Sequence, residues 1–122
     1  MHVLVVDDNE MNRLLATHML RDRGWEVTEA SGGLEAMMML ENNTYDAVLL
    51  DVSMPYLGGD QLCTWIRADE KLGGLPVIAY TAHVMPNEVN RFLEMGFSDV
   101  IAKPSTMDEL VRGIEKHVET AH

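Results

Sequence analysis

Short runs of strand-forming residues alternate along this chain with stretches in which apolar residues recur every three or four positions. The runs cover Val3–Val6, Trp25–Ala30, Ala47–Leu50, Pro76–Tyr80 and Val100–Ala102. An unbroken aliphatic run such as Val3–Val6 is typical of a parallel strand buried on both faces. The polar alternation around Val27 is more typical of a strand at the edge of a sheet. The pattern therefore predicts five strands, each followed by a helix.

The stretches between these runs carry the periodicity and the end signals of helices. Asn9 is a favourable N-cap residue, Gly24 is a favourable helix stop, and Pro86 suits a first helical turn. In the first helix the apolar residues at helical spacing are Met11, Leu14, Leu15 and Met19. The other predicted helices are Leu34–Leu40, one around Leu62 and Ile66 that ends at Gly73-Gly74, Pro86–Gly96, and one that begins near Thr106.

Strands that alternate with helices of this length predict a parallel sheet with right-handed crossovers. Five such units form an α/β domain of three layers, a doubly wound (βα)5 sheet of the flavodoxin-like kind with strand order 2-1-3-4-5. The sequence has no internal repeat, linker or low-complexity tract, so residues 1–122 are expected to form a single domain.

Composition narrows the range of partners and compartments. With 122 residues the chain can bury a core without disulfide or metal staples. Its net charge of −11 argues against binding nucleic acid or an anionic membrane surface. Cys63 has no second cysteine to pair with, which fits a reducing compartment. No apolar run approaches the roughly 20 residues of a spanning helix, and no secretory signal is visible, so a cytoplasmic location is expected.

Charged and polar side chains follow the ends of four predicted strands. Asp7 and Asp8 follow the first strand, Asp51 the third, Thr81 the fourth and Lys103 the fifth. Because the carboxyl ends of parallel strands lie along one edge of the sheet, these side chains are expected to converge. Three carboxylates would repel one another in an empty site, and Mg²⁺, which prefers oxygen ligands, would relieve that repulsion. An aspartate beside Mg²⁺ can attack phosphorus, while a lysine and a hydroxyl bind the phosphoryl oxygens.

Four motifs in this order resemble the receiver domain of two-component response regulators. They are Asp7-Asp8-Asn9, the stretch from Asp51 to Pro55, Thr81-Ala82, and Lys103-Pro104. The resemblance covers essentially the whole chain. The run from Asp8 to Arg13 further resembles receivers that are attached to hybrid sensor histidine kinases or that stand alone.

This resemblance implies a role for each site residue. Asp51 would be the phospho-acceptor. Asp8 and Asp51 would bind Mg²⁺ directly, Asp7 would act partly through water, and the backbone carbonyl of Ser53 would complete the protein ligands. Thr81 would move toward the phosphoryl group and Lys103 would contact its oxygens.

The resemblance also implies finer features around the acceptor. The Lys103-Pro104 bond would be cis, and Ser53 and His83 would flank the path of the attacking water. One position departs from the family. Receivers often carry Tyr or Phe three residues before the lysine, as a switch coupled to the threonine, and here that residue is Val100. Any conformational signal is therefore expected to pass through Thr81 and its loop.

The function implied is a phospho-acceptor module that takes a phosphoryl group from a histidine kinase or a histidine phosphotransfer domain. A downstream protein would bind the surface formed by the Pro86–Gly96 helix, the last strand and the last helix. The chain would not be an enzyme beyond its own phosphorylation and dephosphorylation. Two alternatives stay open: a Mg²⁺-dependent phosphatase with an aspartate nucleophile, which commonly needs a second acid where this chain has Ser53, and a pseudo-receiver used only for binding.

Overall fold

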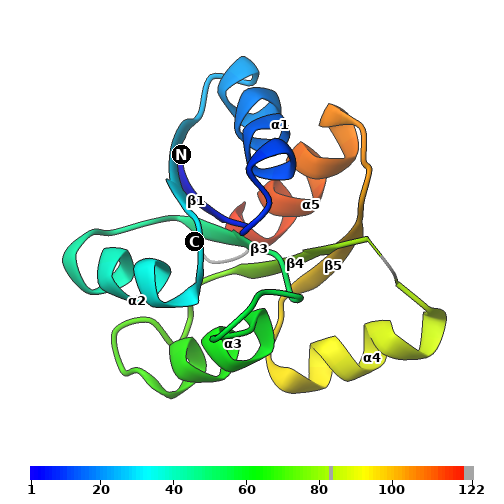
Figure 1. Ribbon diagram of the computed structural model, residues 1–122. Helices are drawn as coiled ribbons and strands as arrows, with labels where there is room; N and C mark the ends of the chain where they lie inside the picture. Colours follow the sequence, from blue (N-terminus) through cyan, green and yellow to red (C-terminus); the bar gives the residue numbers. More distant parts are fainter. Residues whose placement is uncertain (83, 120–122) are drawn as a thin grey trace.

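The computed structural model describes residues 1–82 and 84–119 (Figure 1). Strands and helices alternate throughout, as the sequence pattern predicts. The strands are β1 (His2–Val6), β2 (Glu26–Ala30), β3 (Ala47–Leu50), β4 (Val77–Thr81) and β5 (Asp99–Ala102). The helices are α1 (Glu10–Asp22), α2 (Gly33–Asn42), α3 (Gly59–Ala68), α4 (Pro86–Met95) and α5 (Met107–Glu119).

The strands form one parallel sheet in the order β2-β1-β3-β4-β5, which confirms the predicted topology. In the register of the central strands, Val6 lies beside Leu50, and Leu50 lies beside Ala79. This alignment brings β1 and β3 to an end at the same level, and β4 continues past Ala79 to Thr81. The loops that follow these strands therefore emerge side by side at one edge of the sheet.

Helices cover both faces of the sheet and complete three layers. Figure 1 shows α1 and α5 on one face and α2, α3 and α4 on the other. Because successive strand residues point to opposite faces, each central strand contributes to two cores. The core against α1 and α5 contains Val3, Val5, Leu49, Ile78, Leu20, Leu110 and Ile114. The core against α2, α3 and α4 contains Leu4, Val6, Val48, Leu50, Leu40, Leu62, Ile66 and Phe92.

The C-terminal end of α4 is tied to α3 by one arginine. Arg67 donates hydrogen bonds from Nε to the carbonyl of Gly96 at 2.7 Å and from Nη1 to the carbonyl of Leu75 at 2.6 Å. Its Nη2 donates to Ser98 Oγ at 3.3 Å. Gly96 ends α4 with a φ of 114°, in the left-handed region that glycine adopts without steric cost.

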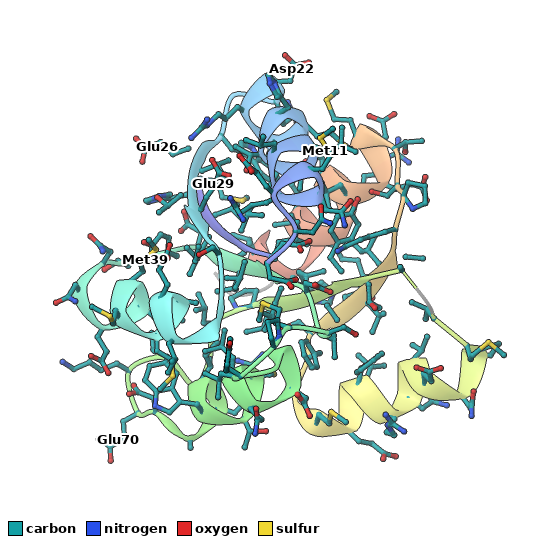
Figure 2. All side chains as sticks on the ribbon, in the orientation of Figure 1. Met11, Asp22, Glu26, Glu29, Met39 and Glu70 are labelled. Atoms are coloured by element: carbon teal, nitrogen blue, oxygen red, sulfur yellow. The ribbon has the colours of Figure 1, made fainter. Side chains whose placement is uncertain are left out.

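The buried face of α1 differs from the face that its apolar periodicity suggested. Met11, Leu14 and Leu15 are exposed by 77%, 42% and 52%, and Figure 2 labels Met11 on this helix. Ala16 and Leu20 are buried instead. Both sets satisfy helical spacing, so periodicity alone could not choose between them. The small Ala16 side chain lets the helix backbone approach the sheet closely.

The predicted end of the third helix was also wrong. We expected it to run to Gly73-Gly74, but α3 ends at Ala68. The Asp69 carboxylate accepts hydrogen bonds from the backbone N–H groups of Lys71 and Leu72, at 2.8 and 3.1 Å. This side chain gives the backbone an alternative to the helical bonds and turns the chain early.

The loop after β3 contains a residue with a strained backbone conformation, and a substitution can test this strain. Tyr56 has a φ of 66° although it is not glycine, and its side chain is 98% exposed. An L-residue in this region costs roughly 1–2 kcal/mol, whereas asparagine tolerates it. We predict that Tyr56→Asn raises the free energy of unfolding by about 1 kcal/mol, measured by urea denaturation. Tyr56→Ala removes the ring but keeps the strain, and an equal gain from it would contradict this explanation.

Candidate functional site

The carboxyl edge of the sheet brings together the acidic residues that the sequence singled out. Asp7, Asp8 and Asp51 each place a carboxylate oxygen within 4.8 Å of the others. Asp7 and Asp51 are 3% and 8% exposed, whereas Asp8 is open to solvent. Thr81 is the last residue of β4 and is buried at the same edge. The predicted convergence of these side chains is confirmed.

Backbone hydrogen bonds between neighbouring strands fix the backbone positions of three of these residues. The Asp51 N–H donates to the carbonyl of Val6 at 2.9 Å, and the Lys103 N–H donates to the carbonyl of Thr81 at 2.9 Å. The Asp7 N–H donates to the carbonyl of Ala30 at 3.2 Å. These bonds continue the sheet ladder, so the sheet positions Asp7, Asp51 and Lys103.

Arg13 holds the loop that carries the acid pair, a role that the sequence did not reveal. Its Nη1 donates to the backbone carbonyl of Asp7 at 2.9 Å, and its Nε pairs with Glu29 at 3.1 Å. Glu29 is labelled in Figure 2. The Asp7 side chain is oriented from the other side, because its Oδ1 accepts from the Asn9 N–H at 2.9 Å. The first helical turn of α1 is thus attached directly to the site.

Lys103 lies between the carboxylates. Its Nζ is 2.7 Å from Asp7 Oδ2 and 3.7 Å from Asp51 Oδ1. The ammonium also lies 5.4 Å from the centre of the Tyr80 ring, within the range of a cation–π contact. One ammonium faces three carboxylates in this cluster, so a net negative charge remains at the site.

This environment changes the acidity of Asp51. Burial raises the pKa of its carboxyl from 3.8 to about 6, and the charges of Asp7 and Asp8 act in the same direction. Lys103 and the backbone N–H of Ser53 act in the opposite direction, the latter at 3.4 Å from Asp51 Oδ1. The ionised carboxylate is therefore disfavoured in the metal-free site. A cluster of carboxylate oxygens with residual negative charge suits a hard divalent cation such as Mg²⁺.

A cavity of about 420 Å³ opens beside Asp51. Asp51, Ser53, Thr81 and Lys103 line it, as the sequence predicted. Asn12 on α1 and Glu88, Arg91 and Phe92 on α4 also line it. Sequence reasoning missed these residues of α4. Arg91 and Phe92 lie three and four positions after Glu88, and this spacing was the available signal, since it places them on one face of a helix.

Gly59 allows α3 to begin directly behind Asp51. A Cβ atom at this position would lie 2.7 Å from Val52 Cα and would also collide with the backbone carbonyl of Asp51. Only glycine fits so close to this backbone. Gly59 is the first residue of α3.

The finer expectations have mixed outcomes. The Lys103-Pro104 bond is cis, as expected. Val100 is half-buried and packs against the core of Phe92 and Phe97. The expected role of His83 falls on a residue outside the described ranges.

The matching family model is the response regulator receiver domain, which aligns with residues 3–115. This chain belongs to that family. The receiver is 38% identical to part of the sensor protein GacS of Pseudomonas syringae, over 93% of this chain but only 13% of the length of GacS. It is 30% identical to the polar-differentiation response regulator DivK of Brucella ovis, over 98% of this chain and 97% of DivK.

Solved receiver structures have the same fold. One is the receiver domain of the sensor histidine kinase PA1611 from Pseudomonas aeruginosa, which has a magnesium ion coordinated in its active-site cleft. It superposes on this receiver with a TM-score of 0.89 and 34% identity, covering 97% of each chain. Across residues 1–82 and 84–119, none of the helices combines the length and apolar character needed to cross a membrane.

The raised pKa of Asp51 predicts a pH dependence of stability. The folded state binds a proton at this site between pH 3.8 and about 6, where the unfolded chain has already lost it. Without a divalent cation, the contribution of Asp51 to stability therefore falls as the pH rises through this window. Urea denaturation in EDTA should show this fall, and Asp51→Asn should remove it. Saturating Mg²⁺ should also remove it, and a fall that is unchanged in Asp51→Asn would assign the effect to another group.

Proposed function

We propose that this receiver accepts a phosphoryl group on Asp51 from a phosphohistidine donor in a two-component phosphorelay. The convergence of three carboxylates and Lys103 at the carboxyl edge of the sheet is the observation that carries this proposal. The acceptor lines an open cavity, so a donor can reach it. Membership of the receiver family supports the same conclusion.

Asp8, Asp51 and the backbone carbonyl of Ser53 would hold Mg²⁺, with Asp7 acting partly through water. A bound Mg²⁺ would neutralise charge on the phosphoryl oxygens during transfer. The carboxylate cluster fits this ion, and the magnesium ion in the cleft of the related PA1611 receiver agrees with it. Asp7 also keeps Lys103 beside Asp51, through the contact of 2.7 Å to its Nζ.

The transfer itself is a displacement at phosphorus. One carboxylate oxygen of Asp51 forms the new P–O bond while the P–N bond of the phosphohistidine breaks. The bonding electrons stay on the imidazole nitrogen, which takes a proton from solvent. Lys103 and the Thr81 hydroxyl bind the remaining phosphoryl oxygens. In hydrolysis a water oxygen attacks phosphorus, the bond to Asp51 breaks, and inorganic phosphate leaves the restored carboxylate.

The first prediction from this proposal concerns phosphorylation of Asp51 by a small-molecule donor. Incubation with acetyl phosphate and Mg²⁺ should give a single phosphoryl adduct by intact-mass analysis. The adduct should be absent in EDTA and in Asp51→Asn. Lys103→Ala should lower its yield strongly, because the phosphoryl charge then loses its ammonium partner. An adduct that survives in Asp51→Asn would move the acceptor elsewhere, and continuous turnover of a phosphoester would favour a phosphatase.

The exposed apolar side of α1 is the proposed docking surface for the histidine donor. Met11, Leu14 and Leu15 are exposed on this helix. Leu15 lines a second cavity, of about 230 Å³, together with Lys103 and Pro104. The apolar surface is thus continuous with the rim of the acceptor site. A donor imidazole must come within bonding distance of Asp51, so the protein that carries it has to cover this rim.

If the donor docks on α1, a substitution there should slow phosphorylation by a protein donor but not by a small-molecule donor. Leu15→Asp should slow transfer from phosphorylated histidine phosphotransfer domains by about tenfold or more, because a charge is then buried in the apolar contact. Phosphorylation by acetyl phosphate should change little. Leu34→Asp on α2 is the matched control, because Leu34 is also exposed, by 64%. Equal losses in the two variants, measured by rapid-quench transfer assays, would reject α1 as the docking surface.

A downstream protein would bind the surface formed by α4, β5 and α5. Two features support this assignment. β5 pairs only with β4, so its other edge is a strand edge that a partner can cover. Met85 and Leu93 are exposed by 59% and 44% at the start and on the outside of α4.

A further inference from the structure

The wall of the acceptor cavity that α4 provides carries two opposite charges. Glu88 and Arg91 lie one turn apart on this helix, and both line the cavity that contains Asp51, Thr81 and Lys103. Neither residue belongs to the acceptor, metal or lysine set described above. Within the described residues, no hydrogen bond or ion pair engages the Arg91 guanidinium. A cation without a partner thus faces the place where the phosphoryl group would form.

The attachment of α4 differs between its two ends. Phe92 is the one side chain of α4 that is buried, and Arg67 holds the carbonyl of Gly96 just beyond the last turn. At the other end, the N-cap residue Met85 makes no side-chain capping bond and is 59% exposed. The first two turns, which carry Glu88, are therefore held less firmly than the end of the helix.

We propose that Arg91 is a second basic ligand of the phosphoryl group on Asp51, and that this contact draws α4 toward the acceptor cavity. The proposal rests on the proposed phospho-acceptor function. The acyl phosphate carries about two negative charges where the free carboxylate carries one. A planar guanidinium matches phosphoryl oxygens with paired hydrogen bonds, and each of those oxygens can accept more than one hydrogen bond.

Glu88 opposes this movement. The same phosphoryl charge that attracts Arg91 repels the Glu88 carboxylate, which lies one turn closer to the start of the helix. The balance of the two forces therefore limits how far α4 approaches the acceptor cavity. This contact supplies a route from Asp51 to α4 in a receiver that has Val100 where an aromatic switch residue would be expected.

The test uses the whole chain with beryllofluoride and Mg²⁺ as a stable phosphoryl mimic. In the parent protein, beryllofluoride should shift the Arg91 Nε–H resonance and slow amide exchange in the first turns of α4. Arg91→Gln should still bind beryllofluoride at saturation, with affinity lowered about three- to tenfold, but α4 should no longer respond. Arg91→Lys should restore part of the response. Glu88→Gln should tighten binding, because it removes the repulsion.

Arg112→Gln is the matched control, because Arg112 is an exposed arginine on α5 that does not line the cavity. It loses the same charge and should behave like the parent protein. If beryllofluoride binds and Arg91→Gln behaves like Arg112→Gln, the role of Arg91 is rejected while the acceptor chemistry stands. If the parent protein forms neither a beryllofluoride complex nor an acetyl phosphate adduct, the proposed function fails, and the role of Arg91 fails with it.

Discussion

The mutual repulsion of carboxylates at one end of the sheet is the constraint on which the site depends. Two of these groups, Asp7 and Asp51, are almost fully buried, and one ammonium lies between them. Burying charges without full compensation costs free energy, and here the negative charge of the carboxylates exceeds the positive charge of the one ammonium. Burial is the largest cause of the raised pKa of Asp51, and the charges of Asp7 and Asp8 raise it further. A bound cation would reduce this uncompensated negative charge, and a phosphoryl group on Asp51 would increase it.

The sheet and the acid cluster could be predicted from the sequence because each rests on a local signal. Aliphatic runs such as Val3–Val6 mark buried parallel strands, and polar residues that follow them must meet at the carboxyl edge. The approach of Asp7, Asp8 and Asp51 follows from these two rules, whereas the strand order was taken from the common doubly wound fold and agrees with the structure. Neither needs the details of side-chain packing.

Features that depend on how elements pack together could not be predicted in this way. The apolar residues of α1 fit two faces of the helix, and only contact with the sheet selects Ala16 and Leu20. Arg13 looks like an ordinary surface residue in the sequence, yet it holds the carbonyl of Asp7. The end of α3 depends on one side-chain hydrogen-bond acceptor, Asp69, in competition with two more helical turns.

The hydrogen bonds that join α3 to the end of α4 have neutral acceptors, and this matters for any movement of α4. Among the described residues, the Arg67 guanidinium donates its hydrogen bonds to backbone carbonyls and to the hydroxyl of Ser98, none of which titrates in the physiological range. Salt and pH weaken ion pairs far more than hydrogen bonds to neutral acceptors. The hydrogen bonds that anchor the C-terminal end of α4 should therefore change little when the charge near Asp51 or the salt concentration changes.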